Sequence, residues 1–404
     1  MDQREAAMLL LRKICGELDQ FITTDAHAGL LGGYTGAALF YAYYFQLTGE
    51  EQHLDKAVAV VERCLSALSD TPMDGSHCSG MAGIAWCLQH LGAIGLLDTA
   101  DTTDAFAEID AGVADFMAAE LAAGRNDFLH QGLGGALYFL ERWPATAAAA
   151  SLEGLIQHLE DTALTLTGGI AWKDNFSSTS EANKDQDLFN LGLAHGVPAI
   201  ISVLARCYEK NIARHRVLPL LSGSISWLQQ TRNLASPIGQ SLFPTLVNAS
   251  GAVVGAAHSR LGWCYGDLGI AATLLGAGHR LQRGDYQHHA LQIFRQVARE
   301  RNVKNGAVHD ACMCHGSAGI AHILQQAGLY YGDEQLLSAS QYWWKTTLEM
   351  NTWTDGPAGF KFYHHPDFIS SHNMLEGIAG IGLSLISFAD TSIKPAWQES
   401  LLIF

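Results

Sequence analysis

The apolar positions of this chain follow helical spacing, and the helices that they predict are of two kinds. Between residues 50 and 68, apolar side chains recur three and four positions apart, which predicts an amphipathic helix with one buried face. The stretches 192–208 and 319–331 are apolar on nearly every side, and a helix of that kind must be buried. The pattern predicts an alternation of buried inner helices and amphipathic outer helices.

A small-residue motif, Gly-x-x-Gly, opens each predicted inner helix. It occurs seven times, once with Ala as its last residue, at Gly33/Gly36, Gly80/Gly83, Gly132/Gly135, Gly196/Ala199, Gly266/Gly269, Gly316/Gly319 and Gly377/Gly380. A motif repeated along the chain indicates one supersecondary unit used seven times. We expect the glycines to permit close approach of the inner helices and flexible turns before them. Seven helix pairs predict an all-α fold, a double-layered α/α toroid or barrel.

The repeats also bear on domain organisation. Length alone allows two or three domains, but the motifs continue from residue 33 to residue 380 without a polar linker, so we expect a single domain over 1–404. The longest intervals between motifs flank the fourth repeat and contain inserts near 165–190 and 232–260. These inserts are predicted to be loops with some strand. Substrate contact and surface elaboration explain them equally well.

Composition and charge narrow the classes of function. Hydrophobic residues make up 48 % of the chain, which excludes disorder, and the net charge of −16 disfavours binding to nucleic acid. No uninterrupted apolar run approaches the length of about 18 residues that indicates a membrane span. The first 21 residues predict an amphipathic helix and no signal peptide. We therefore expect a cytoplasmic protein whose eight cysteines are thiols or metal ligands rather than disulfides.

Alignment of the repeats on the first Gly gathers chemically active residues in two columns. The residue two before that Gly is, in order, Leu31, Cys78, His130, Ala194, Cys264, Cys314 and Leu375. The residue one before it is Gly32, Ser79, Gln131, His195, Tyr265, His315 and Glu376. Both columns fall at the N-terminal ends of the inner helices, where backbone N–H groups favour anionic ligands such as thiolates.

Cys264, Cys314 and His315 supply two sulfurs and one nitrogen in one register, a set that suits zinc. Three protein ligands would leave a fourth position open, which is typical of catalytic zinc. Alternatives remain at this point: Cys312 could replace Cys314, Cys78 shares the column, and His195 could be a fourth ligand. The other cysteines fall in helical patterns and are interpreted as core residues.

Three segments carry a family resemblance: LAHG at 193–196, WCYG at 263–266 and CHGSAG at 314–319. Together with the repeats they resemble the lanthionine synthetase C-like proteins, the LanC-type cyclases. The resemblance implies an α/α toroid with one zinc ion bound by Cys264, Cys314 and His315. It implies a cytoplasmic cyclase that adds peptide cysteine thiols to dehydroalanine or dehydrobutyrine and so forms lanthionine thioether rings.

The resemblance also implies roles around the metal. His195 matches the acid/base histidine of the family, Arg260 matches an arginine that could stabilise an enolate, and Tyr265 matches a hydrogen-bonding tyrosine. Asp127 matches an aspartate that could orient His195, although His130 and Gln131 depart from the usual form of that segment. Each has a structural alternative: an ion pair for Arg260, a helix N-cap for Asp127 and simple packing for Tyr265.

The implied partners are a dehydrated precursor peptide, with a leader and a core rich in Ser, Thr and Cys, a separate dehydratase, and an exporter. Three rival functions stay open. A LanC-like protein could join glutathione to dehydrated residues or bind it without forming rings. An α/α-barrel glycosidase would need two carboxylates, whereas the columns offer only Glu376. A non-enzymatic repeat scaffold would bind no metal.

Overall fold

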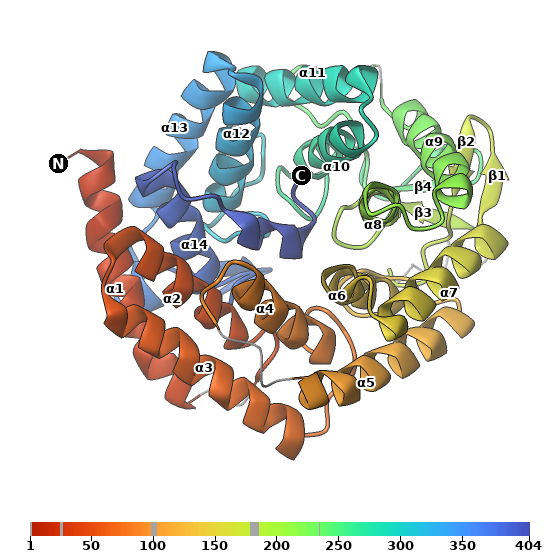
Figure 1. Ribbon diagram of the computed structural model, residues 1–404. Helices are drawn as coiled ribbons and strands as arrows, with labels where there is room; N and C mark the ends of the chain where they lie inside the picture. Colours follow the sequence, from red (N-terminus) through yellow and green to blue (C-terminus); the bar gives the residue numbers. More distant parts are fainter. Residues whose placement is uncertain (1, 25–26, 98–102, 178–185, 234) are drawn as a thin grey trace. The chain divides into compact units, whose positions relative to one another are not determined.

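The structure, a computed structural model shown in Figure 1, describes all residues except 1, 25–26, 98–102, 178–185 and 234. It divides into two compact units. Unit 1 comprises Met1–Ile109 and Val308–Trp397, and unit 2 comprises Asp110–Ala307 and Gln398–Phe404. The single domain expected over 1–404 stays a prediction.

Unit 1 is mostly helical. Its elements are α1 (Gln3–Thr24), α2 (Thr35–Thr48), α3 (Glu51–Asp70), α4 (Met81–Ala93), α12 (Ser317–Tyr331), α13 (Glu334–Glu349), β6 (Phe362–His364), β7 (Asp367–Ile369) and α14 (Ile378–Ala389). A short 3-10 turn, η4 (Pro357–Gly359), precedes β6, and α5 (Thr103–Ala122) begins in this unit and ends in unit 2. The last 3-10 turn, η5 (Ala396–Leu401), likewise begins in unit 1.

Unit 2 combines helices with short strands. After α5 its elements are η2 (Gly132–Gly134), α6 (Gly135–Arg142), α7 (Thr146–Thr162), β1 (Leu164–Leu166), β2 (Gly169–Ala171), β3 (Leu188–Asn190), α8 (Val197–Glu209), α9 (Arg214–Gln230), β4 (Leu246–Asn248), β5 (Val253–Val254), α10 (Asp267–Arg280) and α11 (Gly284–Glu300). Strands β1 and β2 form a hairpin, and β3, β4 and β5 form an antiparallel sheet in which Phe189 is paired with Val247.

Burial confirms the predicted alternation of helix types. Every residue from Thr35 to Tyr44 of α2 is buried, whereas α3 buries one face, that of His53, Ala57, Val60, Val61 and Cys64. In unit 2, α10 is buried from Asp267 to Gly278 and its neighbour α11 again buries one face. In each unit the inner helices therefore form the core, and the outer helices cover it.

Five inner helices pack against the outer helix that follows them in sequence. Pairs α2–α3 and α12–α13 pack together in unit 1, and α6–α7, α8–α9 and α10–α11 do so in unit 2 (Figure 1). The last inner helix, α14, packs instead against α1, the helix at the start of the chain. The amphipathic N-terminal helix is thus the outer partner of the seventh motif, which the sequence pattern alone did not indicate.

The described part of the chain contains strands in both predicted inserts. The hairpin β1–β2 and strand β3 fall in or next to 165–190, and β4 and β5 fall within 232–260, as predicted. The antiparallel pair β6–β7 in unit 1 was missed. Its segment, Phe362–Ile369, is dominated by aromatic and histidine residues and shows no clear alternation of apolar and polar positions.

The structure shows which atoms leave no room for a side chain at the second Gly of the motif. A Cβ atom on Gly319 would lie 2.0 Å from the carbonyl oxygen of Met313, and one on Gly380 would lie 1.9 Å from that of Met374. The same Cβ atom on Gly380 would lie 3.1 Å from Cβ of Met313, in the preceding repeat. The second Gly of the motif therefore accommodates both its own preceding turn and the neighbouring repeat.

This packing predicts opposite effects for two Gly-to-Ala substitutions. Gly319→Ala forces a methyl group against backbone and should lower the free energy of unfolding by about 3 kcal/mol. Gly154→Ala, within α7, meets nothing within 4 Å and should raise it by about 0.5–1 kcal/mol. Urea denaturation of both variants and of the wild type tests these two predictions. Equal unfolding midpoints for the two variants would refute the steric explanation.

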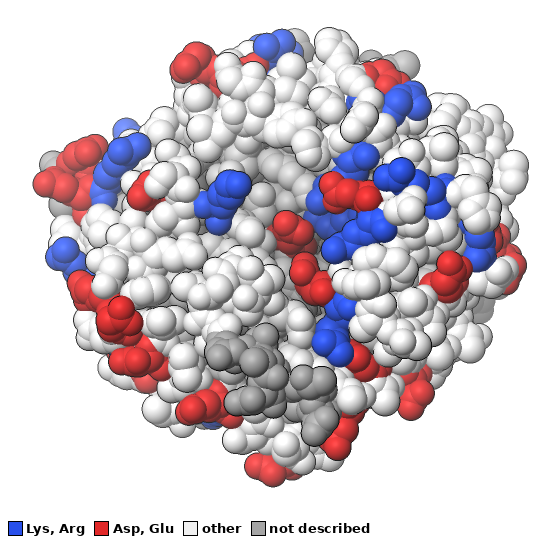
Figure 2. Space-filling view, in the orientation of Figure 1, with Lys and Arg blue, Asp and Glu red and all other residues white. Residues whose placement is uncertain are grey.

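Charge is mixed on the face drawn in Figure 2. Figure 2 shows basic and acidic side chains close together in the region of α8 and α10. At the C-terminal ends of these two helices, Arg280 Nε donates to Glu209 Oε2 at 3.0 Å. The chain's net negative charge therefore does not produce a surface of one sign in this region.

None of the described helices combines the length and the apolarity that crossing a membrane requires.

Candidate active site

A shared turn precedes several inner helices and positions the candidate residues. In four repeats the residue six before the first Gly is Asp or Asn, and in three of them its Oδ1 accepts the backbone N–H two residues later. The donor–acceptor distances are 2.9 Å for Asp74, 2.8 Å for Asn190 and 2.9 Å for Asp310. These Asx turns fix the chain just before the two columns of candidate residues.

The first column is also linked from repeat to repeat by backbone hydrogen bonds. In unit 1, Cys314 N donates to Leu375 O at 2.9 Å, Leu375 N to Leu31 O at 3.0 Å, and Leu31 N to Cys78 O at 2.9 Å. In unit 2, Ala194 N donates to Cys264 O at 3.3 Å. These four bonds link residues of the column to their counterparts in the next repeat, whereas His130 N in unit 2 donates to Asp127 Oδ1 instead.

Unit 1 holds two of the three predicted zinc ligands. Cys314 and His315 are both buried, at 7 % and 6 % exposure, at the start of α12. Asp310 Oδ2 lies 3.4 Å from His315 Nε2 and accepts the backbone N–H of Tyr363 at 2.8 Å. This carboxylate lies beside the imidazole of His315 and can orient it, as in carboxylate–histidine–metal arrangements.

Cys312, the competitor of Cys314, is held differently. Its Sγ accepts the backbone N–H of His315 at 3.5 Å, and it is 1 % exposed. Burial raises the pKa of this thiol to about 11. Asp310, Cys312 and His315 have ligand atoms within 4.8 Å of one another, so this trio is a second set that could hold a metal ion. The sulfur–amide hydrogen bond favours a structural role for Cys312 within the turn.

Unit 2 holds the third predicted ligand and the predicted acid/base group. Cys264 is 3 % exposed and immediately precedes Tyr265, whose ring centroid lies 5.9 Å from that of His195. Gly192 packs on both residues, since a Cβ there would lie 2.7 Å from Cys264 O and from the Tyr265 ring. The backbone of the fourth repeat is therefore pressed against the Cys264–Tyr265 segment, next to His195.

His195 and Asp127 form a short, partly buried hydrogen bond. His195 Nδ1 donates to Asp127 Oδ2 at 2.6 Å, and the side chain of Asp127 is fully buried while that of His195 is 15 % exposed. The other carboxylate oxygen accepts the N–H of His130 at 2.7 Å. Asp127 thus fixes its own turn and holds His195 so that Nε2 is left for proton transfer. It is not the helix N-cap of the alternative, because Gln131 occupies that position before η2.

Tyr265 belongs to a polar network with residues that the sequence analysis missed. Asn190 Nδ2 donates to Tyr265 Oη at 3.2 Å, to Ser177 Oγ at 3.1 Å and to Asp174 Oδ2 at 3.2 Å. Burial raises the pKa of Tyr265 to about 12, so its hydroxyl stays protonated near neutral pH. The aromatic ring of Phe176 lies parallel to His195, with centroids 4.6 Å apart.

Arg260 and the remaining candidates occupy the turns as well. Arg260 is exposed and stands six residues before its Gly, where other repeats place Asp or Asn. Glu376 opens the seventh motif, and its N–H bonds to Asn373 Oδ1 at 2.8 Å. All eight cysteines lie in described residues and none forms a disulfide.

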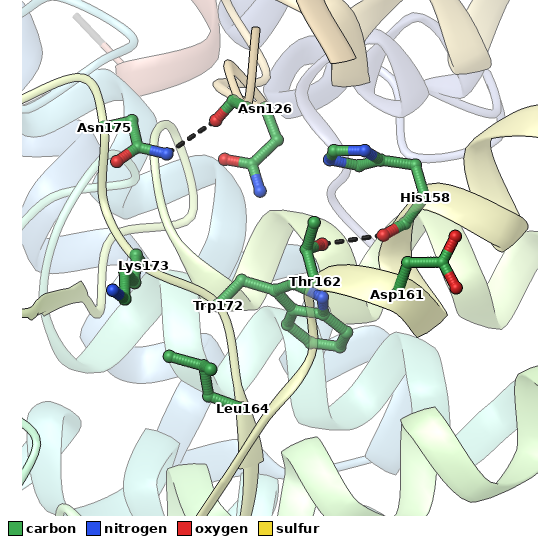
Figure 3. A pocket seen from close by; sticks show the side chains of 9 residues that line it. Asn126, His158, Asp161, Thr162, Leu164, Trp172, Lys173 and Asn175 are labelled. Carbon is green, nitrogen blue, oxygen red and sulfur yellow. Dashed lines mark hydrogen bonds between the residues drawn. The ribbon is translucent and has the colours of Figure 1, made fainter. Parts of the chain in front are cut away.

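A small pocket lies behind the Phe176 segment in unit 2. It encloses about 250 Å³ and is lined by Asn126, His158, Asp161, Trp172, Lys173 and Asn175, with others. Figure 3 shows Asn175 reaching across toward the Asn126 segment, where its Nδ2 donates to Gly124 O at 2.6 Å. Asn126 directly precedes Asp127, and Asn175 directly precedes Phe176. The pocket therefore borders two residues that contact the His195 ring.

Fold and site together define an α/α repeat protein that presents thiols, imidazoles and a carboxylate from the turns before its inner helices. A family model described as lanthionine synthetase C-like protein matches residues 25–402. The chain belongs to the lanthionine synthetase C-like family. No curated protein matched the chain by sequence.

Solved structures agree with this assignment at the level of the fold. Nisin cyclase matches with a TM-score of 0.76 at 21 % identity, over 98 % of this chain and 96 % of that one. This likeness confirms the predicted fold class, the all-α double-layered α/α toroid. A sugar epimerase from a ruminal bacterium (TM-score 0.48, 12 % identity, 95 % of this chain and 99 % of that one) is less similar. Cellobiose 2-epimerase from Bacillus thermoamylovorans (TM-score 0.46, 10 % identity, 91 % of this chain and 90 % of that one) is less similar again.

Proposed function

We propose that this chain is a zinc-dependent lanthionine synthetase, which adds cysteine thiols of a dehydrated peptide to dehydroalanine or dehydrobutyrine. Family membership supports a thioether-forming cyclase. The observation that carries the proposal further is the arrangement in unit 2. There a histidine held by a buried carboxylate touches the tyrosine that directly follows a candidate zinc thiol.

We propose that Cys264 joins Cys314 and His315 as the zinc ligands. The support is the backbone pattern of the first column, in which four residues bond to their counterparts in the next repeat. Cys264 and Cys314 are counterparts in consecutive repeats, so the same pattern would bring their thiols together. The donor set fits zinc, and the Asp310 carboxylate, 3.4 Å from His315 Nε2, would orient the imidazole. A zinc ion held there would deprotonate a substrate thiol at neutral pH.

The residues around that place would perform the rest of the addition. The substrate sulfur bonds to Cβ of the dehydro residue, and the electron pair of the double bond moves onto the carbonyl oxygen as an enolate. His195 Nε2 takes the proton that the substrate thiol loses and delivers it to Cα, which restores the carbonyl group, while Asp127 holds Nδ1 and stabilises the charged imidazole. Arg260 would stabilise the enolate oxygen, and the protonated hydroxyl of Tyr265 would donate a hydrogen bond.

The proposed partners follow from this reaction. The substrate is a precursor peptide with a leader and a core rich in Ser, Thr and Cys. A separate dehydratase must act first because the addition consumes dehydrated residues. We place the reaction in the cytoplasm, before an exporter acts on the peptide.

A dehydrated peptide containing one cysteine tests the reaction and its main alternative in one assay. Ring formation should leave the peptide mass unchanged while its thiol stops reacting with a maleimide. If glutathione is the thiol source, the mass should instead rise by one glutathione when both are supplied. Intact thiols and unchanged mass after incubation with zinc-loaded protein would rule out both activities.

A further inference from the structure

We infer that Phe176 is a positioning residue for His195. Its ring lies parallel to the imidazole, with an interplanar angle of 8° and centroids 4.6 Å apart. It is also stacked on His130, at 5.4 Å and 15°. Phe176 therefore covers one face of the ring whose Nδ1 is held by Asp127, and it restrains rotation of the imidazole out of the plane of that hydrogen bond.

The backbone that carries Phe176 is held from several sides. Asp174 Oδ1 accepts the N–H of Phe176 at 2.9 Å and that of Ser177 at 3.2 Å. Asp174 N donates to Leu188 O at 2.7 Å, which ties the turn to strand β3. Asn175 anchors the next position through its 2.6 Å bond to Gly124 O (Figure 3). The ring is thus presented to His195 by a fixed turn.

The turn is coupled to the other groups around His195 through Asn190. This side chain bonds to Asp174, to Ser177 and to the hydroxyl of Tyr265, whose ring contacts His195. One carboxamide therefore sets both the Phe176 turn and the tyrosine. His195 is contacted by Asp127 at Nδ1 and by aromatic rings of Phe176, Tyr265 and His130.

The exposed fraction of Phe176 indicates that this residue contributes more to the surroundings of His195 than to the hydrophobic core. The residue is 38 % exposed, so it buries less apolar surface than the core phenylalanines, such as Phe189 at 0 %. We explain this large apolar side chain at the surface by its effect on His195. It keeps water away from one face of the imidazole and restrains the rotation of that ring. Without it, the Nδ1–H bond would be open to exchange with solvent from that face.

The first test of this inference is kinetic, and it rests on the proposed function because it measures ring formation. Phe176→Ala should lower kcat for ring formation by about tenfold with little change in KM, because His195 is less well oriented. Phe176→Tyr keeps the ring and should restore wild-type kcat, whereas Phe176→Leu should not. Leu218→Ala removes an apolar side chain of similar exposure, 40 %, from α9 and should behave as wild type.

A second test needs no turnover. A histidine Nδ1–H bonded to a carboxylate gives a far-downfield proton resonance, which Asp127→Asn should abolish and so assign. In Phe176→Ala this resonance should broaden through solvent exchange, while Phe176→Tyr and Leu218→Ala should retain it. A sharp resonance in Phe176→Ala would overturn the inference even if the protein is an active cyclase. Broadening in a protein that forms no rings would instead refute only the proposed function.

Discussion

Cys314→Ala and Cys264→Ala proteins are expected to be purified without stoichiometric zinc and to form rings about a thousandfold more slowly than the wild type. Each substitution removes one of three proposed protein ligands, and the loss of a metal that activates the thiol removes several kcal/mol of transition-state stabilisation. Metal content by mass spectrometry and rates with the dehydrated peptide check both effects.

Cys312→Ser is the matched control for these variants. It lies two residues from Cys314, and serine keeps an acceptor for the backbone N–H of His315. We expect this protein to retain zinc and activity. Zinc lost from Cys312→Ser but kept by Cys314→Ala would favour the Asp310–Cys312–His315 set instead. Zinc kept by the Cys264→Ala protein would show that unit 1 binds the metal alone.

His195→Ala should keep stoichiometric zinc while its rate of ring formation falls by about a thousandfold, since a general acid typically contributes a factor of about 10² to 10⁴. Asp127→Asn should lose roughly a hundredfold, because the amide can present its NH₂ group to Nδ1 and favour the wrong tautomer. Both rates are measured with saturating dehydrated peptide.

The control for a histidine substitution is His289→Ala. His289 is an exposed residue of α11 that pairs with Gln229, away from the His195 contacts within unit 2. Its activity should equal that of the wild type. If His195→Ala lost zinc together with activity, His195 would be a metal ligand, the alternative raised by its place in the second column.

The repeat architecture could be predicted because its signals are local. Apolar spacing separates helices buried all round from helices with one buried face, and the structure shows both in α10 and α11. The pairing of α14 with α1 could not be predicted in this way, because it joins segments from the two ends of the sequence. Periodicity identifies a helix face and not the partner of that face.

The candidate site was predicted to the extent that it follows the repeat register. Cys264, Cys314, His315 and His195 stand at fixed offsets from a Gly, and the 2.6 Å contact between His195 and Asp127 is the one that an orienting carboxylate needs. Their chemical roles stay proposals. The Asx turns at Asp74, Asn190 and Asp310 form a third column, six residues before the Gly, which a longer alignment window would have shown.

Phe176 and the Asn190 network could not be predicted. Phe176 lies in an insert that no other repeat shares, so the register gives it no counterpart. Its stacking on His195 depends on the turn around Asp174 and on side-chain bonds between distant residues such as Asn190 and Tyr265. Contacts of this kind are set by tertiary packing, for which sequence spacing provides no signal.

X-ray absorption spectroscopy of the zinc-loaded wild-type protein tests the central claim most directly. The proposed ligands predict two sulfur atoms at about 2.3 Å, one imidazole nitrogen at about 2.0 Å and one exchangeable light atom. The Cys264→Ala protein, reconstituted with zinc, should show at most one sulfur. A wild-type spectrum with a single sulfur and carboxylate oxygen, or a protein that binds no zinc, would contradict the account.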